Sequence, residues 1–436
     1  MKKGLPAPGQ TRLMTVVAVD DTDSRTRGMC TTYLATRIAA RLSERAGPDA
    51  VERVLLVRLN PAVEHKTRGN AALAVHTSVD PEPAFACARE ELELAETDDP
   101  DTHPGIVVVP GDPSDVPDAV ARFAREGVCE RHDLADALAL IETHGYRAEG
   151  WKTGRGRIGA LAAAGAWPAF GDWTYEHIAY REPDRWGTPR DVDRESVFAA
   201  ADRGYPDVWD TVDCVDDEAV CIPHTPGPVL YGIRGDDSDT VRSVATAIDS
   251  EPVARTRLFV TNQGTDAHLR EGQVGDLADG HAYRVSGTVS DAPETREGGH
   301  VFLEIAGDGA TLDCAAFEPT KRFRDWVRAL RAGDRITVCG EVSDGTLKLE
   351  KFAVQELRRT ERATPACPDC GRSMESAGVD AGYRCRDCGT SAAGKVPREV
   401  ERDLELGWYE VPPVARRHIA KPLVRGGFDA PTHPER

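Results

Sequence analysis

The fold is set by the stretch Val16-Val17-Ala18-Val19-Asp20-Asp21-Thr22-Asp23-Ser24, followed closely by Gly28-Met29-Cys30-Thr31-Thr32-Tyr33. The apolar run predicts a buried strand, and three carboxylates follow at its end. Mg²⁺, which binds one or two carboxylates together with substrate phosphates, is the usual neutraliser of such a cluster. The stretch therefore indicates phosphoryl or nucleotidyl chemistry. The alternative is a plain polar turn, because Asp and Ser favour turns.

Residues 14–165 alternate short apolar runs with helical stretches, which predicts an α/β domain. We expect strands at residues 15–19, 54–59, 71–79 and 106–109, and helices at 31–44, 83–96, 116–126, 134–144 and 158–165. The carboxylates then lie at the carboxyl end of a strand, where open α/β sheets bind ligands. Residues 1–13 lack periodicity and are predicted to be a disordered extension or a mis-assigned start.

Residues 166–275 predict a second α/β unit of ferredoxin-like type, with apolar runs at 220–222, 229–233 and 258–261 and a helix near 239–248. An acidic stretch at residues 182–218 includes Trp186, Tyr205 and Trp209. Carboxylates and aromatic faces suit a small organic cation. A solvated acidic loop is the alternative.

Residues 278–358 predict an OB-fold. Five alternating strands are expected at 282–289, 300–306, 312–317, 336–342 and 347–355, with one helix at 321–330 between the third and the fourth. OB-fold barrels commonly hold single-stranded nucleic acid, although five-stranded barrels also serve as spacers.

Residues 363–392 predict a zinc ribbon. Cys367 and Cys370 form one Cys-x-x-Cys pair, and Cys385 and Cys388 form a second pair after 14 residues. Four thiolates can close a tetrahedral Zn²⁺ site, and a glycine follows each pair as the knuckle turns require. The metal is expected to be structural, and residues 393–436 are expected to form a C-terminal tail.

The chain has 436 residues, a formal net charge of −19 and 11 cysteines that are scattered apart from the four above. This length suggests about three domains. The sequence has no apolar stretch long enough to span a membrane and no leader pattern, so we expect a soluble, cytoplasmic protein without a disulfide framework.

Three basic islands interrupt this acidic chain, at residues 152–157, 321–331 and 416–425. A solvated surface is the alternative for each island. Three islands in separate segments nevertheless favour an extended polyanion such as RNA.

Two further segments suit phosphate. Gly154-x-Gly156-x-x-Gly159 matches the dinucleotide fingerprint formally, but no strand precedes it, so NAD binding is not expected. Its glycines, with Lys152 and Arg155, open a predicted helix whose free N–H groups can bind a polyphosphate. The loop Lys66-Thr67-Arg68-Gly69-Asn70 offers the same chemistry, and either segment is alternatively a turn.

These strings, together with Cys221-Ile222-Pro223 and Tyr231-Gly232-Ile233-Arg234-Gly235, resemble the archaeal tRNA(Ile) 2-agmatinylcytidine synthetase family, TiaS, over nearly the whole chain from Met14. The resemblance implies a kinase-like domain, a ferredoxin-like domain, an OB-fold and a zinc ribbon. It also implies an ATP-dependent ligase that replaces the C2 oxygen of the wobble cytidine of tRNA(Ile) (CAU anticodon) with agmatine, after phosphorylating that oxygen, so that the tRNA decodes AUA.

The resemblance also implies roles for individual residues. Mg²⁺ would be held by Asp20, Asp21 and Asp23, and Thr31 would be autophosphorylated. Phosphate charge would be stabilised by Lys66, Arg68, Lys152 and Arg155. Further contacts to ATP are expected from Thr22, Ser24, Gly154 and Gly156.

Agmatine, a dication, is expected between the first two domains near the acidic stretch, with Asp193, Glu195, Asp213 and Tyr231 as candidate contacts. The tRNA phosphates are expected to meet the basic islands at Lys321, Arg322, Arg324, Arg328, Arg416, Arg417 and Lys421. Such contacts position RNA without reading its sequence. No membrane and no obligate protein partner is expected.

Two other classes of protein stay open. One is a single-strand-binding protein built on the OB-fold and the ribbon, which would not need the carboxylates. The other is an aspartyl-phosphate phosphohydrolase, because Asp21-Thr22-Asp23 after a strand resembles that nucleophile motif. Such an enzyme would not need the barrel and the ribbon.

Overall fold

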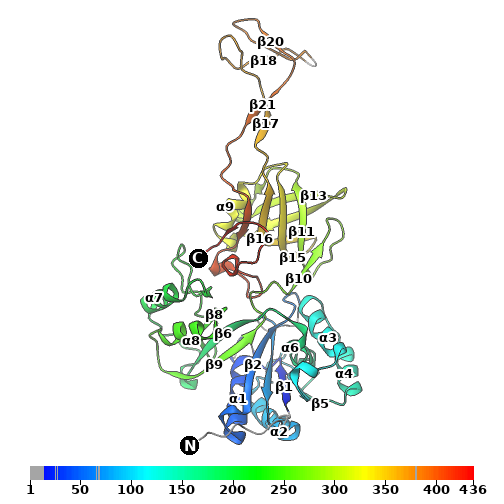
Figure 1. Ribbon diagram of the computed structural model, residues 1–436, viewed down its shortest axis with the longest axis vertical. Helices are drawn as coiled ribbons and strands as arrows, with labels where there is room; N and C mark the ends of the chain where they lie inside the picture. The colour runs from blue at the N-terminus through cyan, green and yellow to red at the C-terminus, as the bar shows by residue number, and fades with distance from the viewer. Residues whose placement is uncertain (1–13, 25, 27, 65, 67–68, 379–380) are drawn as a thin grey trace, which may run out of the picture.

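The structure, a computed structural model, describes residues 14–24, 26, 28–64, 66, 69–378 and 381–436. It is elongated, with an α/β body at one end, a β-barrel in the middle and a small ribbon on a narrow neck at the other end (Figure 1). The extension predicted over residues 1–13 lies outside the described residues. Within the described part, no helix is long and apolar enough to cross a membrane.

The body contains a nine-stranded sheet with strand order β5-β4-β1-β3-β2-β9-β6-β8-β7. All four strands predicted for residues 14–165 are present, and β5 was not predicted. The central β1 pairs antiparallel with both β3 and β4, so the sheet is mostly antiparallel. The rule that open α/β sheets bind ligands at the carboxyl ends of their strands applies to mostly parallel sheets. The bounds are β1 Thr15–Asp20, β2 Val51–Arg58, β3 Ala71–Thr77, β4 Gly105–Pro110, β5 Arg147–Gly150, β6 Thr174–Arg181, β7 Val208–Trp209, β8 Val229–Gly235 and β9 Val253–Thr261.

The two α/β units predicted for residues 14–165 and 166–275 share this sheet. Strand β2 of the first unit pairs in parallel with β9 of the second, with Leu56 opposite Thr261. The apolar run at residues 220–222 forms no strand and lies in a loop before β8. The boundary between the two units is therefore a seam within one sheet.

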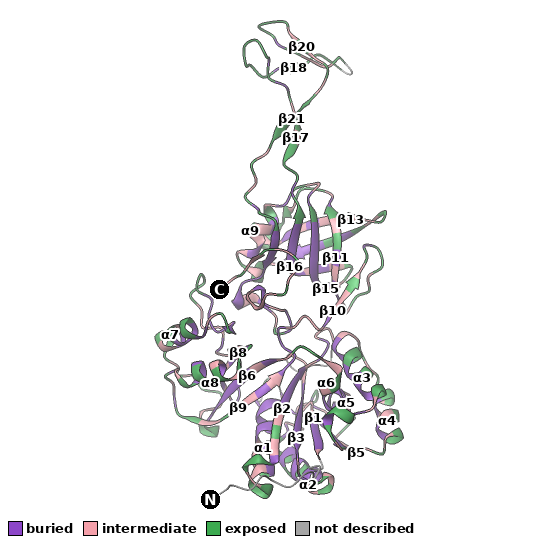
Figure 2. Cartoon of the chain, viewed as in Figure 1, coloured by how far each residue is buried: buried purple, intermediate pink, exposed green. Residues whose placement is uncertain are grey.

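Helices cover both faces of the sheet (Figure 2). In β1, Val17 and Val19 pack against α1 and α2, whereas Val16 and Ala18 pack on the opposite face against α3 to α6. All four side chains are fully buried, which explains why this strand reads as an unbroken apolar run. Helix α2 ends earlier than predicted, in a 3-10 turn at Leu92–Leu94. The bounds are α1 Thr31–Ala46, α2 Pro81–Glu91, α3 Asp118–Cys129, α4 Leu134–Thr143, α5 Gly156–Ala164, α6 Ala166–Ala169, α7 Arg194–Gly204 and α8 Ser238–Thr246.

The five strands predicted for residues 278–358 close into a barrel. Pairing runs from β11 to β13, β14, β16 and β15 and back to β11, and only the β14–β16 pair is parallel. Helix α9, Phe323–Arg328, occupies the predicted position between the third and fourth strands. The bounds are β11 Ala282–Val289, β13 Val301–Gly307, β14 Ala310–Ala316, β15 Arg335–Ser343 and β16 Thr346–Glu356.

The ribbon stands on a two-stranded neck in which β17, Thr360–Ala363, pairs with β21, Val396–Glu399. Beyond the neck lie the short strands β18 Glu375–Ser376, β19 Tyr383–Arg384 and β20 Ser391–Ala392. Residues 393–436, predicted as a tail, return along the neck to the barrel, where β22, Gly407–Glu410, pairs with β16, and β23, Thr432–His433, pairs with β22. We call residues 411–436 the return segment.

Candidate active site

A cavity of about 750 Å³ lies where the two halves of the nine-stranded sheet meet. One wall comes from the end of β1 and the start of α1. The opposite wall comes from β6, β8 and the loop of residues 220–227, which we call the wall loop. The cavity gathers seven of the predicted site residues, namely Asp20, Asp21, Asp23, Thr31, Lys66, Arg155 and Gly156.

The carboxylates at the end of β1 are largely enclosed by protein. Asp21 has a φ of 57°, a left-handed conformation that residues other than glycine rarely adopt. Desolvation, reinforced by the charge of Asp21, raises the pKa of Asp20 well above its usual value. Desolvation also raises the pKa of Asp21 to about 6, although Arg155 opposes the shift. A further cation in the cavity would stabilise both charges.

Arg155 and the glycines after it bring α5 against these carboxylates. Nε of Arg155 donates to Oδ2 of Asp21 at 2.8 Å. A Cβ on Gly159 would lie 1.9 Å from Oδ2 of Asp20, and one on Gly156 would lie 2.5 Å from the backbone nitrogen of Gly105. Gly156 and Gly159 therefore allow α5 to pack closely against β1 and β4. This close packing explains the glycine pattern without a bound dinucleotide.

Thr31 is the first residue of α1 and lines the cavity. Its hydroxyl accepts a hydrogen bond from the hydroxyl of Thr22 at 3.1 Å. The Cys30 side chain makes no capping hydrogen bond to α1, whose first turn contains no acid. The positive end of the helix dipole at Thr31 is therefore suited to a phosphate.

The remaining residues predicted to bind ATP stand behind this wall. Ser24 donates to Oδ2 of Asp99 at 2.5 Å, and Nζ of Lys152 donates to the carbonyl oxygen of the same aspartate. These bonds brace the loop that contains Asp99. Four of the predicted residues, all in the described part of the chain, do not line the cavity: Thr22, Ser24, Lys152 and Gly154. Arg68 lies outside the described residues.

The floor of the cavity, where the two halves of the body meet the return segment, consists of Arg58, Glu176, Arg234 and His418. Nε of Arg234 lies 3.2 Å from Oε1 of Glu176. None of these four residues was predicted as a site residue. They come from β2, β6, β8 and the return segment, so only the folded chain brings them together.

The predicted agmatine contacts lie elsewhere. Asp193 caps α7 by accepting from the backbone N–H of Glu195, and the hydroxyl of Tyr231 donates to the carbonyl oxygen of Ala245. Asp213 is fully buried and pairs with Arg322 at 3.0 Å. None of the four predicted contacts, all of which the structure describes, lines the cavity.

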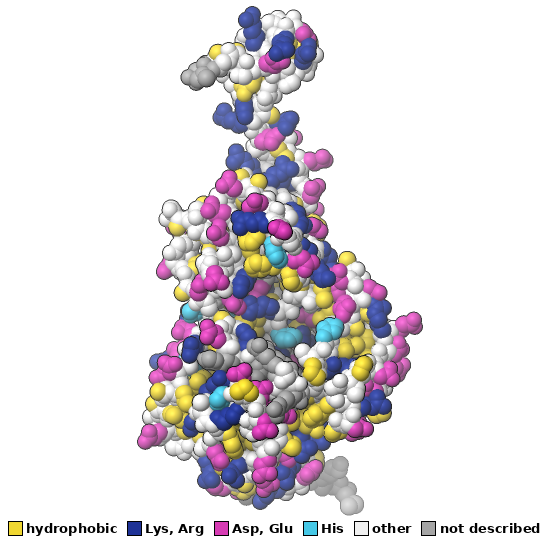
Figure 3. Space-filling model, turned by 180° about the vertical axis from the view of Figure 1, so that it is seen from behind, with side chains coloured by type: hydrophobic (Ala, Val, Ile, Leu, Met, Phe, Trp, Pro, Cys, Tyr) yellow, Lys and Arg dark blue, Asp and Glu magenta, His cyan; other side chains and the backbone are white. Residues whose placement is uncertain are grey.

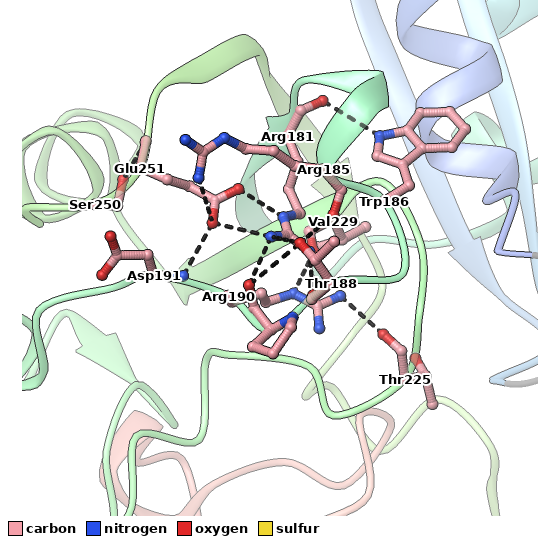
Figure 4. Close-up of polar contacts among 11 residues, drawn as sticks. Arg181, Arg185, Trp186, Thr188, Arg190, Asp191, Thr225, Val229, Ser250 and Glu251 are labelled. Carbon is pink, nitrogen blue, oxygen red and sulfur yellow. Dashed lines mark hydrogen bonds and ion pairs between the residues drawn. The ribbon is translucent and has the colours of Figure 1, made fainter.

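A buried ion pair fixes the loop between β6 and α7 (Figure 4). Arg181 and Glu251 form two hydrogen bonds of 2.6 and 3.0 Å, and their side chains are 1% and 0% exposed. Glu251 also accepts from the backbone N–H of Asp191 at 2.9 Å. The loop is thereby tied to the residues that precede β9.

Arg190, on the same loop, holds the wall loop. It donates from Nε to the carbonyl oxygen of Val229 and from Nη2 to that of Thr225, both at 2.8 Å (Figure 4). Arg190 and Thr225 both line the cavity. The position of the wall loop therefore depends on a guanidinium that the Arg181–Glu251 pair helps to place.

The four cysteines of the ribbon form the predicted metal site. Their sulfur atoms lie within 4.8 Å of one another. Gly371 and Gly389, with φ of 73° and 72°, donate their N–H groups to the carbonyl oxygens of Cys367 and Cys385, which forms the two knuckle turns. Four thiolates in this arrangement suit tetrahedral Zn²⁺, as predicted.

Comparison with protein-family models assigns the chain. The TiaS TCKD domain matches residues 16–80, the TiaS FLD domain matches 154–268 and the TiaS C-terminal zinc ribbon domain matches 364–404. The isoleucine-tRNA 2-agmatinylcytidine synthetase TiaS of Haloquadratum walsbyi is 55% identical, and the match covers 97% of this chain and 100% of that protein. The chain belongs to the TiaS family. The Methanosarcina mazei protein of the same name is 46% identical, with 94% and 97% covered.

Solved TiaS structures share the whole architecture. A complex of TiaS with an isoleucine tRNA and ATP superposes with a TM-score of 0.88 at 41% identity, and covers 97% of this chain and 100% of that one. A complex of TiaS with the same tRNA, AMPCPP and agmatine has a TM-score of 0.85 at 38% identity, with the same coverage. Apo TiaS has a TM-score of 0.85 at 42% identity and covers 95% and 98%.

In this TiaS chain, most of the predicted RNA-binding cations have carboxylate partners. Arg416, with a side chain 2% exposed, pairs with Asp210 and Glu410. Arg417 pairs with Glu341 and Glu350, and Arg322 with Asp213, Asp216 and Glu435. Arg324 and Arg328 pair with Glu318 and Asp325, Nζ of Lys421 lies over the ring of Phe428, and Lys321 is exposed. Several of these ion pairs join the barrel, the return segment and the body.

The missed floor residues had one usable signal. Arg234 belongs to the string Tyr231-Gly232-Ile233-Arg234-Gly235, which carries part of the resemblance to TiaS. Its partner Glu176 and the nearby Arg58 sit in strands, and His418 follows two arginines of the basic island that was assigned to RNA. Their sequence neighbourhoods contain no motif that points to the cavity.

Proposed function

We propose that this chain conjugates agmatine to C2 of the wobble cytidine of the CAU-anticodon tRNA(Ile), driven by ATP. The observation that carries the proposal is the cavity, in which Asp20, Asp21, Thr31 and Arg155 face the floor and the wall loop within a chain of the TiaS family. It provides one space in which phosphoryl transfer and amine attack can occur on the same base.

The proposed reaction has two steps. First, the C2 oxygen of the cytidine attacks the γ-phosphorus of ATP, and ADP leaves. Then the neutral amine of agmatine attacks C2, the bond from C2 to the phosphorylated oxygen breaks, inorganic phosphate departs and the amine loses a proton. The anticodon base must leave its stack to present C2 to the cavity.

Residues on the β1 wall are proposed to handle the triphosphate. Arg155 and Lys66 carry positive charge into the cavity, and the N-terminus of α1 adds its dipole at Thr31. Following the resemblance, we assign Thr31 as a residue that is autophosphorylated by ATP, a transfer separate from the two steps of the ligase reaction. Thr22, whose hydroxyl donates to that of Thr31, would orient it.

Mg²⁺ fits this wall through few protein ligands. Among the described residues, only the four cysteines bring three or more ligand atoms within 4.8 Å, so the three aspartates form no ready-made cage. Asp20 and Asp21 both have raised pKa values that a divalent cation would lower. We propose that one or both carboxylates would hold Mg²⁺ together with phosphate oxygens. The bound ion would supply charge neutralisation at the transferred phosphoryl group.

The wall loop is proposed to receive agmatine, in place of the four residues first predicted. Two of the carbonyl oxygens at this end of the cavity already bind one guanidinium, that of Arg190. The guanidinium of agmatine can use neighbouring carbonyls in the same way, because its planar set of N–H donors requires hydrogen-bond acceptors as well as opposite charge. In this arrangement Arg190 is a positioning residue.

We propose that the protein acts in the cytoplasm and that other parts of the chain hold the tRNA. The strand order β9-β6-β8-β7 is that of a ferredoxin-like unit, the barrel is that of an OB-fold, and we assign residues 14–165 as the kinase-like domain. Lys and Arg side chains line the neck and ribbon (Figure 3). Exposed cations there, Arg359, Arg362 and Lys395, supplement Lys321 as contacts to phosphates.

The test is incorporation of labelled agmatine at high salt with Mg-ATP and the CAU transcript, beside a transcript with uridine at the wobble position. We expect label on the wobble cytidine alone, lost in Asp21→Asn and Thr31→Ala. The matched control is Asp115→Asn, an exposed acid on the 3-10 turn Pro113–Asp115. Tight RNA binding without ATP consumption or incorporation would instead favour the single-strand-binding alternative.

A further inference from the structure

Arg58 on the cavity floor is a half-buried cation that forms no ion pair with another described residue. Its Nε donates to Oε1 of Gln263 at 2.9 Å, and no carboxylate of the described residues lies within ion-pair distance of its guanidinium. Desolvation by the surrounding protein lowers its pKa to about 10. Arginines withdrawn from water are normally paired, so the anion that Arg58 accommodates is expected to come from outside the chain.

The rest of the floor does not cancel this charge. Glu176 accepts from Nε of Arg234 and, through its other oxygen, from Nε2 of Gln263 at 2.5 Å. The floor therefore contains two guanidiniums but one carboxylate, and it has a net charge of about +1 at neutral pH. Such a surface repels dicationic agmatine and attracts an anion.

His418 adds an unused donor beside these guanidiniums. A Cβ on Gly69 would lie 2.6 Å from Nη1 of Arg58 and 3.7 Å from Cδ2 of His418, so both side chains lie against the same glycine. The imidazole is exposed and lines the cavity, and no hydrogen bond joins its ring to another described residue. The charge of Arg234, desolvation and the charge of Arg58 hold its pKa well below the usual value, so the ring is neutral and can donate one N–H.

The backbone of the return segment is anchored independently of this ring. The N–H of Gly264 donates to the carbonyl oxygen of His418 at 2.8 Å, and the N–H of Asp266 to that of Ile419 at 3.2 Å. The position of His418 is thus fixed without a side-chain hydrogen bond within the described chain, which leaves its imidazole available to a ligand.

We propose that Arg58, Arg234 and His418 form a second phosphate-binding site on the cavity floor, separate from the triphosphate site at Asp20 and Thr31. Guanidinium forks and an imidazole N–H match the oxygens of a phosphate group. The phosphate comes either from the leaving group, as inorganic phosphate, or from a phosphodiester beside the flipped base. Only the choice between these sources rests on the proposed function.

The test is calorimetric binding of inorganic phosphate, and separately of the ribotrinucleotide CAU, to the full zinc-loaded chain without ATP or agmatine. Arg58→Gln and His418→Asn are compared with Arg53→Gln, an arginine on the same strand that stacks on Trp167 outside the cavity. We expect the two floor variants to bind at least one of these probes about tenfold more weakly, and the control to bind like wild type.

The two probes separate the sources. Weaker phosphate binding in the floor variants identifies the leaving group, weaker trinucleotide binding identifies the phosphodiester, and unchanged affinity for both probes overturns the site. Gly69→Ala provides a second variant in case Arg58→Gln does not fold, because its Cβ would displace only the tip of Arg58. Since agmatine and full-length tRNA are absent, this result is independent of whether the ligase assay succeeds.

Discussion

The guanidinium of Arg155 lies 2.8 Å from the carboxylate of Asp21, and it is the main opponent of the desolvation that raises the pKa of that carboxyl group. Arg155→Gln should leave Asp21 harder to ionise and should remove a cation from the triphosphate site. We expect kcat/KM for ATP to fall by about 100-fold, as loss of a charge-assisted hydrogen bond of about 3 kcal/mol implies. Lys152→Gln, which changes a residue behind the wall, is the control and should stay within about threefold of wild type. An unchanged ATP dependence in Arg155→Gln would contradict the assigned role.

Asp21 should also make the body less stable as pH rises. Its pKa of about 6 in the folded chain exceeds the usual value, so the stabilising contribution is full below about pH 4 and is lost as pH rises through 6. Asp21→Asn should therefore be about 2 kcal/mol more stable than wild type at pH 7.5, with the difference vanishing near pH 4. Denaturant unfolding without Mg²⁺ or ATP measures this difference. As a control, Asn in place of the exposed Asp115 (Asp115→Asn) should leave the pH dependence of the unfolding free energy unchanged. A variant less stable than wild type at pH 7.5 would contradict the explanation.

Local patterns predicted the parts of the fold that depend on neighbours in sequence. The predicted strand at residues 282–289 coincides with β11, because alternating residues of a barrel strand face in and out. Gly371 and Gly389 adopt the positive φ that the knuckle turns require. Asp20, Asp21 and Thr31 lie in one short stretch, so their convergence at the cavity could be read directly.

Convergence of distant segments could not be read. Arg58, Glu176 and His418 meet because β2 and β6 both flank β9 and because the return segment folds back, none of which one sequence reveals. Arg416 lies in an island without acids, but it pairs with Asp210, about 200 residues earlier, and with Glu410 on β22. The pairing of Asp213, a predicted agmatine contact in the acidic stretch, could not be read for the same reason, since its partner Arg322 lies in the barrel.

The Arg181–Glu251 pair should stabilise the second half of the body and tune the wall loop. Glu251→Gln leaves the buried guanidinium of Arg181 without its negative partner, which should lower the unfolding free energy by about 3 kcal/mol. Burial raises the pKa of Glu251, but its contacts to Arg181 and Asp191 outweigh burial and leave the pKa below the usual value. This stabilisation is therefore present above about pH 4.5 and is lost as pH falls further. Glu52→Gln, in an exposed pair with Arg53, should cost less than about 0.5 kcal/mol.

The same variant distinguishes positioning from a purely structural role. If the wall loop, positioned by Arg190, holds agmatine, Glu251→Gln should raise the KM for agmatine by several-fold while the KM for ATP is unchanged, at a temperature where the variant is folded. Equal changes in both KM values would indicate general loss of structure.

Removal of zinc should unfold the ribbon and leave the rest of the chain intact. The ribbon is joined to the barrel only through the neck strands β17 and β21 in the described chain, and its small core consists of Cys367, Met374 and Cys385 with two partly buried side chains. Cys385→Ser should therefore lose zinc and about 10 kcal/mol of metal-dependent folding free energy in this module. Because the cavity lies in the body at the opposite end of the molecule, ATP affinity should stay within about twofold of wild type while affinity for the tRNA falls (Figure 1). Metal analysis, ATP titration and a tRNA filter assay measure these effects, with the exposed Cys214→Ser as control. If ATP affinity were lost when zinc is lost, the prediction would be contradicted, and the ribbon and the body would be coupled despite their separation in the fold.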